Sequence, residues 1–107
     1  MLAEIKSLRS YDSEEIPHNT SDCAVSLIVS LGPKDVDTHE DFDLEVVTFG
    51  WLQNIRRAWW GRNSLILPVF DWNAVTSELE QMLAQCAGED WPQVREKVCE
   101  FLEPRKT

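Results

Sequence analysis

The sequence has few of the residues that enzymes and metal proteins most often use for chemistry. Its 107 residues include three cysteines and two histidines. Cys23, Cys86 and Cys99 lie far apart at apolar or marginal positions, so we interpret them as free, buried thiols. No Cys-x-x-Cys or His-x-x-His spacing occurs, and His18 and His39 lie in polar stretches. The chain also lacks a Gly-x-Ser-x-Gly motif and a glycine-rich phosphate loop, so we expect no catalytic residue, no metal and no cofactor.

Long hydrophobic runs are missing as well. No stretch approaches the roughly 20 apolar residues that a transmembrane helix needs. The first residues, Met1 to Lys6, lack the basic and then apolar layout of a signal peptide. These absences predict a cytoplasmic protein that has no membrane partner. The length leaves room for one domain over residues 1–107.

Basic residues are scarce relative to acidic ones. The sequence contains 10 lysines and arginines against 19 aspartates and glutamates, which gives a formal net charge of −9 and a pI near 4.5. Because nucleic-acid binding draws on Lys and Arg contacts with phosphate, this balance argues against nucleic acid as a partner. It favours a partner with a cationic surface, since opposite potentials steer association.

The most regular pattern present is a pair of strands within residues 22–50. Large apolar side chains fall at odd positions over 23–31 and at even positions from Phe42, with acidic residues between them. This period of two is typical of half-buried strands. Turn residues at 32–35 separate the two runs. The side chains expected on the shared buried face are Cys23, Val25, Leu27, Val29, Phe42, Leu44 and Val46.

The second half of this predicted hairpin is acidic. Six carboxylates fall between positions 35 and 45, with no Lys or Arg among them. They are Asp35, Asp37, Glu40, Asp41, Asp43 and Glu45. The segment lacks the glycine and glutamate spacing and the helical flanks of an EF-hand, which excludes that calcium site. We interpret it either as a solvated acidic face or as a surface for a cationic partner.

The other elements of the first two thirds are shorter. The side chains of residues 1–10 show a short alternation with a period of two, which predicts a first strand. Residues 51–59 carry apolar side chains at helical spacing, which predicts a short helix. Residues 64–71 form an apolar run of strand length, in which Pro68 favours an edge position because it removes one hydrogen-bond donor.

After these strands the apolar period changes to that of a helix. Val75 to Cys86 carries one helical stripe, which Asp71 or Asn73 can cap at its start and Gly88 can end in a left-handed conformation. A second helix begins at Asp90 and is stopped by Pro104. The expected buried stripe of this helix is Trp91, Val94, Val98, Phe101 and Leu102.

Strands therefore occupy the first part of the chain and two consecutive helices the last part. Such segregation is typical of an α+β domain. We predict an antiparallel sheet of about four strands, with the two C-terminal helices packed on one face and a short helix near 51–59.

One cluster combines basic and aromatic residues. It runs from Arg56 to Arg62 and includes Trp59 and Trp60. By itself such a cluster suits stacking on nucleic acid, but the net charge of the chain opposes that partner. We expect one of the two tryptophans to pack in the core and the arginines to pair with nearby acids. A tryptophan that stays exposed would be an aromatic anchor for a protein partner.

Six short stretches, spread in order over nearly the whole chain, resemble those of a known family. They are Ala3–Leu8, Leu31–Lys34, Asp41–Leu44, Thr48–Leu52, Gly61–Ile66 and Trp91–Val94. Together they are similar to the immunity protein 8 family of bacterial polymorphic toxin systems. In that family a glycine often follows the Gly-Pro-Lys turn and a proline often precedes the tryptophan, where this chain has Asp35 and Gly50.

The resemblance implies a cytosolic, non-enzymatic protein that is made beside a secreted or contact-delivered toxin and neutralises it by tight binding. Immunity families of this kind pair with several toxin chemistries, and the cationic cleft of a nuclease is one that an acidic phosphate mimic would fit. We therefore expect the six hairpin carboxylates, with Trp59 or Trp60, to face the cognate toxin, on a monomer or a homodimer.

Two other functions stay open from the residues alone. One is a small interaction or adaptor module that uses, or dimerises through, a free sheet edge at Ser64 to Phe70. The other is a small hydrolase with an acidic site, which would need two carboxylates about 5–10 Å apart in a deep pocket.

Overall fold

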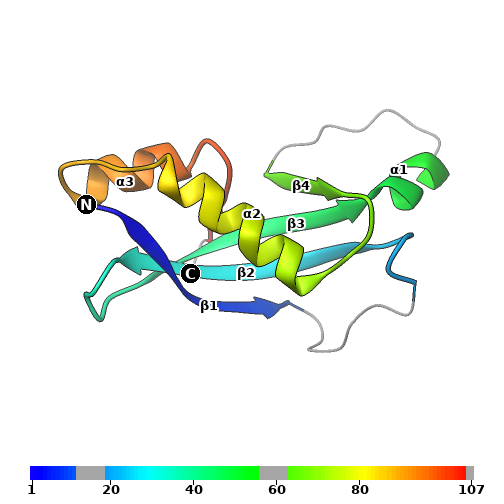
Figure 1. Ribbon diagram of the computed structural model, residues 1–107, viewed down its shortest axis with the longest axis horizontal. Helices are drawn as coiled ribbons and strands as arrows, with labels where there is room; N and C mark the ends of the chain where they lie inside the picture. The colour runs from blue at the N-terminus through cyan, green and yellow to red at the C-terminus, as the bar shows by residue number, and fades with distance from the viewer. Residues whose placement is uncertain (12–18, 56–62, 106–107) are drawn as a thin grey trace.

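A computed structural model describes residues 1–11, 19–55 and 63–105 of the chain (Figure 1). In chain order the elements are β1 (Ala3–Ser10), β2 (Ala24–Pro33), β3 (Glu40–Thr48), α1 (Phe49–Ile55), β4 (Ser64–Leu67), α2 (Trp72–Ala84), α3 (Trp91–Val98) and β5 (Glu103–Pro104). The α+β class is confirmed, with two helices near the C-terminus. Helix α1 occupies the first part of the helix predicted near 51–59, and residues 56–59 lie outside the described residues. Within the described ranges no helix is long and apolar enough to cross a membrane.

The strands form one mixed sheet in the order β1-β2-β3-β4, and β5 pairs with β3 as well. β2 runs antiparallel to both β1 and β3 as predicted, but β4 runs parallel to β3. A tight hairpin would make β4 antiparallel. Here α1 follows β3 directly, and the chain re-enters the sheet with Ser64 beside Glu45. A parallel pair needs such a crossover connection. β4 is an edge strand that ends before Pro68, which agrees with the expectation for that proline.

The register of β2 and β3 confirms the predicted buried face. Leu27 lies opposite Leu44, and Val29 lies opposite Phe42. All four are buried in the core cluster, to which α2 and α3 contribute their apolar stripes. Figure 1 shows α2 crossing in front of the strands on that side. β2 continues through Pro33, so the turn comes two residues later than the sequence suggested, because Gly32 still pairs with β1.

Aspartates cap both C-terminal helices: Asp90 as predicted, and Asp71 of the two candidates, Asp71 and Asn73, that the sequence left open. Asp71 accepts a hydrogen bond from a backbone N–H of α2, and Asp90 does the same for α3. The predicted end of the first helix at Gly88 is wrong, since α2 ends at Ala84 and Gly88, like the other described glycines, does not have a positive φ. Gly88 instead allows close packing, because a Cβ there would lie 2.8 Å from the Cβ of Gln93.

The end of the last helix also differs from the expectation. α3 ends at Val98 and not at Pro104, and Phe101 is 46% exposed instead of buried. Leu102 packs in the core, and the N–H of Arg105 donates to the carbonyl oxygen of Asp41 at 3.0 Å. These two contacts turn the chain away from a helical path and add β5 to the sheet.

Gly32 of β2 lies in close contact with the backbone of the turn that leads into β3. A Cβ at this position would lie 1.9 Å from the backbone carbonyl oxygen of Thr38. We expect Gly32→Ala to force the arms apart and to lower the free energy of unfolding by about 1–3 kcal/mol, as overpacking does. Urea denaturation followed by tryptophan fluorescence measures this change. The exposed-site control Thr38→Ala should change it by less than about 0.5 kcal/mol, and equal effects of the two variants would contradict the close approach.

Asp35 occupies a backbone conformation that favours glycine. It lies in the β2–β3 turn with φ of 66° and is exposed. We expect Asp35→Gly to raise the free energy of unfolding by about 0.5–1 kcal/mol, because the left-handed conformation is costly for a residue with a Cβ. Asp35→Ala removes the same carboxylate but keeps the Cβ, and it should give no such gain in urea denaturation. Equal stability of the Gly and Ala variants would mean that the turn is not strained.

Candidate binding surface on the open face of the sheet

The sheet has one face covered by α2 and α3 and another face turned away from them, here called the open face. Successive side chains of a strand point to opposite faces. Odd positions of β3 and even positions of β2 therefore lie on the open face, opposite the core side chains. Described side chains that the register places on it include Arg9, Ser26, Ile28, Ser30, Asp41, Asp43 and Glu45.

Glu40 is the one predicted interface acid of β3 that lies on the helix side. Arg95 of α3 donates from Nε to both of its carboxylate oxygens, at 2.9 and 2.8 Å. The hydrogen bonds to Glu40 raise the pKa of the Arg95 guanidinium group above its ordinary value. The pair joins the start of β3 to a helix 55 positions away in sequence. Glu40 thus contributes to holding α3 on the sheet.

Asp41 is engaged on the open face. It accepts a hydrogen bond from the hydroxyl group of Ser30, whose residue is only 1% exposed. Arg9 lies 3.6 Å from the other carboxylate oxygen, and His39 approaches to 4.0 Å. A buried hydroxyl group without a partner is costly, so Asp41 satisfies a structural need as well as pairing with Arg9.

Asp43 is paired with a residue from the C-terminal end of the described chain. Arg105 donates from one guanidinium nitrogen to its carboxylate at 2.9 Å, and the guanidinium carbon lies 4.8 Å from the ring centre of Tyr11. That distance is typical of a cation–π contact. Hydrogen bonds to Tyr11 and Asp43 raise the pKa of the Arg105 guanidinium group.

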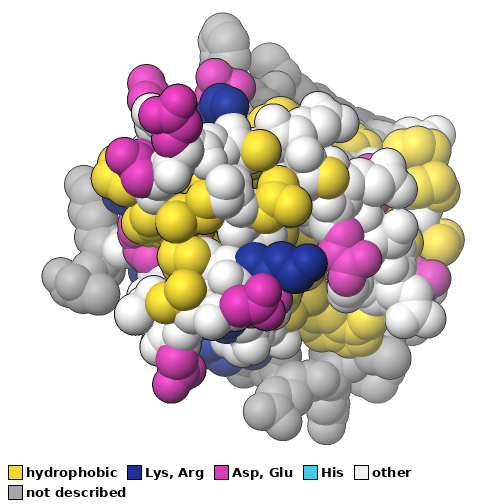
Figure 2. Space-filling view, turned by 60° about the vertical axis from the view of Figure 1, so that its left-hand side comes forward, with side chains coloured by type: hydrophobic (Ala, Val, Ile, Leu, Met, Phe, Trp, Pro, Cys, Tyr) yellow, Lys and Arg dark blue, Asp and Glu magenta, His cyan; other side chains and the backbone are white. Residues whose placement is uncertain are grey.

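The other three predicted interface acids make no ion pair within the described part of the chain. Asp35 and Asp37 are exposed at the β2–β3 turn, and Glu45 is half-buried on β3. Three of the six hairpin carboxylates are therefore tied to the protein's own arginines, and the other three have no arginine partner among residues 1–11, 19–55 and 63–105. In Figure 2, acidic side chains are dispersed among hydrophobic and neutral ones, and the lysines and arginines in view lie next to acids. Trp59 and Trp60 lie outside the described residues.

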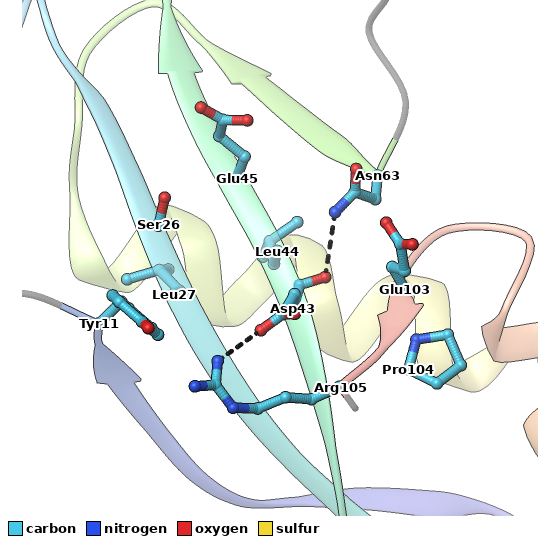
Figure 3. A pocket seen from close by; sticks show the side chains of 10 residues that line it. All are labelled: Tyr11, Ser26, Leu27, Asp43, Leu44, Glu45, Asn63, Glu103, Pro104 and Arg105. Carbon is cyan, nitrogen blue, oxygen red and sulfur yellow. Dashed lines mark hydrogen bonds and ion pairs between the residues drawn. The ribbon is translucent and has the colours of Figure 1, made fainter. Parts of the chain in front are cut away.

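The open face contains a hollow of about 590 Å³, which we call the polar hollow (Figure 3). It is lined by Tyr11, Ser26, Leu27, Asp43, Leu44, Glu45, Asn63, Glu103, Pro104 and Arg105. Figure 3 shows Asp43, Glu45 and Arg105 on the side of the sheet away from α2. The hollow is open to solvent and the Asp43 side chain is 43% exposed, so it does not desolvate a carboxylate as a catalytic acid requires.

Four lining residues of the polar hollow were not expected from the sequence. Tyr11 comes directly after β1 and Asn63 directly before β4, outside the alternating apolar pattern of these strands. Glu103 and Arg105 flank Pro104, where the sequence predicted the end of a helix and not a strand. The only sequence signal for β5 is the proline itself, which ends a helix without saying where the chain goes next. These four residues line one hollow because segments far apart in the sequence pair, such as β5 with β3.

A second hollow, of about 310 Å³, lies between α2 and β4. Its lining is mostly apolar and includes Leu65, Met82 and the exposed ring of Phe101, with Glu78 as its carboxylate. A single carboxylate beside apolar side chains does not supply the acid and base pair of a glycosidase. This apolar hollow adjoins the edge strand β4.

The three cysteines are free as predicted, but only Cys86 is fully buried, whereas Cys23 and Cys99 are half-buried at the margin of the core. Burial raises the pKa of Cys23, Cys86 and Cys99 above the ordinary thiol value. A reactive cysteine needs the opposite shift, since the thiolate is the nucleophile. Across residues 1–11, 19–55 and 63–105, no group of three or more His, Cys, Asp or Glu residues is arranged to hold a metal ion.

Comparison with protein families decides the relationship of the chain. The family model described as Immunity protein 8 matches residues 3–103. The chain belongs to the immunity protein 8 family. This confirms the resemblance of the six short stretches, all of which lie within the matched range. No curated protein and no solved structure matches the chain.

The raised thiol pKa values of this immunity-family protein predict slow thiol chemistry. In the folded state at pH 8, we expect Ellman's reagent to modify the three cysteines several-fold more slowly than in urea, because burial hinders access and the raised pKa lowers the fraction of thiolate. In urea all three should react rapidly. A thiol that reacts as fast in the folded protein as in urea would contradict the raised pKa of that residue, and Cys→Ser variants would identify it.

Proposed function

We propose that this chain neutralises a cognate bacterial toxin domain by binding to it, without catalysis of its own. Membership of the immunity protein 8 family over residues 3–103 is the observation that carries the proposal. The fold agrees with such a role, since a rigid sheet backed by two helices can present a preformed surface. A preformed surface loses little conformational entropy on binding, which favours tight inhibition.

We assign the toxin-facing surface to the acidic hairpin and the open face. Asp35, Asp37 and Glu45 make no ion pair within the described ranges, so their charge is available to a cationic partner. The other three hairpin acids, Glu40, Asp41 and Asp43, act there mainly by fixing the shape of the surface through their contacts with arginines. Trp59 or Trp60 is retained as the proposed aromatic anchor.

The net charge of −9 points to the class of toxin. A nuclease domain has a cationic cleft for phosphates, and a rigid acidic surface can enter it as a phosphate mimic. Opposite potentials also raise the rate of association, which benefits an inhibitor that must act before its target does damage. The corresponding setting is the cytoplasm, with one domain over residues 1–107 acting as a monomer or a homodimer.

A second candidate function is a sheet-edge interaction module that has no toxin partner. It is favoured by the edge position of β4, by the exposed side chain of Ile66 on that strand, and by the adjoining apolar hollow. An exposed strand edge is a template for pairing with another chain. A mass that rises with protein concentration, without any bound toxin, would favour this function over toxin neutralisation.

The first test uses the reading frame next to the gene of this protein. If that frame encodes a secreted protein with a variable C-terminal domain, we expect production of that domain to stop growth and co-production of this chain to restore it. The two purified proteins should co-elute in gel filtration and bind with a dissociation constant below about 10 nM, as tight inhibitors do. Absence of binding at micromolar concentrations, with both proteins folded, would refute neutralisation of that toxin by direct contact.

The second test asks whether the hairpin tip faces the toxin. Asp35→Asn with Asp37→Asn removes two charges that make no ion pair within the described ranges, and Glu78→Gln with Glu80→Gln removes two exposed charges from α2. We expect the hairpin variant to lose at least about tenfold in toxin affinity and part of its salt dependence, since both charges lie at the proposed contact. Equal affinities of the two variants would remove the hairpin tip from the interface.

A further inference from the structure

We propose that the polar hollow is the site that receives a guanidinium or ammonium side chain of the toxin domain, between Glu45 and Glu103. The inference rests on the proposed function and deepens it. It moves the centre of recognition from the hairpin tip to the middle of the open face. It also assigns a role to Glu103, Tyr11 and Arg105, which the hairpin pattern does not contain.

The register of the strands brings the carboxylates of the hollow together. Asp43 and Glu45 are two positions apart on β3 and point to the same face. β5 pairs antiparallel with β3 and places Glu103 directly opposite Asp43. Directly opposed residues have Cβ atoms about 4.5–5.5 Å apart. Three carboxylates thus converge on one hollow from two paired strands.

The charges of the hollow do not cancel. Its lining contains three carboxylates and one guanidinium group, a net charge of −2. Arg105 is paired with Asp43 at 2.9 Å. Glu45 and Glu103 make no ion pair within the described ranges of the chain, although both line the hollow. A cation that enters from a partner would therefore meet two carboxylates that Arg105 does not neutralise.

Arg105 shows what kind of group the hollow accommodates. Its guanidinium carbon lies over the ring of Tyr11 at 4.8 Å while one nitrogen donates to Asp43 (Figure 3). A planar cation is thus already held by a carboxylate and an aromatic face. The volume of about 590 Å³ is large enough for further side chains, and the hollow opens to solvent on the face not covered by α2. Charge complementarity favours an arginine or a lysine as the entering group.

A competing source of the cation is the chain itself. Arg56, Arg57 and Arg62 belong to a segment outside the described residues, and an internal arginine in the hollow would serve stability and not recognition. The two sources predict different results when the carboxylates are removed. Loss of toxin affinity at unchanged stability indicates a partner cation, whereas loss of stability at unchanged affinity indicates an internal one and overturns the proposal.

The first arm of the experiment uses the toxin domain from the adjacent reading frame. Glu45→Gln with Glu103→Gln keeps the side-chain shapes and removes two charges from the hollow. Glu89→Gln with Glu96→Gln removes two exposed charges near and on α3 and serves as the matched control. We expect the hollow variant to bind the toxin at least tenfold more weakly than the control variant, with equal thermal stability of both. Equal toxin affinity of the two variants overturns the inference and leaves the proposed function standing.

The second arm does not depend on the identity of the toxin. A tri-arginine peptide and a tri-citrulline peptide, which has the same shape without charge, are each titrated into the isotopically labelled protein. We expect tri-arginine to shift the backbone amide resonances of Tyr11, Glu45 and Glu103, and the hollow variant to lose these shifts. Shifts that are spread over the whole acidic surface, or that tri-citrulline reproduces, overturn a cation site in the hollow. Absence of toxin binding by the wild-type chain in the first arm would instead refute the proposed function.

Discussion

The pairing of β2 with β3 in one register is the constraint on which the rest of this structure depends. Leu27 opposite Leu44 and Val29 opposite Phe42 place all four side chains in the core. A shift by one residue would turn this set to the other face of the sheet, since the side-chain period of a strand is two. The same register decides which acids of β3 face α3 and which face away from the helices.

Because of that register, the acids of β3 pair with arginines on both faces of the sheet. Glu40, at an even position, contacts Arg95 on the helix side. Asp41 and Asp43, at odd positions, lie on the other face and contact Arg9 and Arg105. Each of these pairs is exposed to solvent to a substantial degree, so its contribution to the free energy of unfolding is modest. Their larger effect is geometric, because each fixes a neighbouring segment against β3. An acidic strand thereby becomes a rigid surface that keeps part of its negative charge.

This arrangement suits an immunity protein better than an enzyme. The polar hollow is open to solvent, and none of its carboxylates, on Asp43, Glu45 and Glu103, belongs to a fully buried residue of the kind that hydrolytic chemistry uses as an acid. Recognition has different requirements, namely a fixed shape and a charge that the partner completes. We infer that the polar hollow meets both, because Arg105 holds the carboxylate of Asp43 in place while Glu45 and Glu103 make no ion pair within the described ranges.

The sequence by itself determined the features that depend on neighbours in the chain. The period of two predicted the buried face of β2 and β3, Asp71 and Asp90 predicted the helix starts, and the order of elements predicted the α+β class. The family followed from short stretches that are also local. Only the tertiary structure decided the parallel direction of β4 and the return of the chain as β5 beside β3. It also decided that Asp43 pairs with an arginine 62 positions away. Periodicity and capping act within a few residues, whereas these pairings depend on how distant segments pack, which a local pattern does not encode.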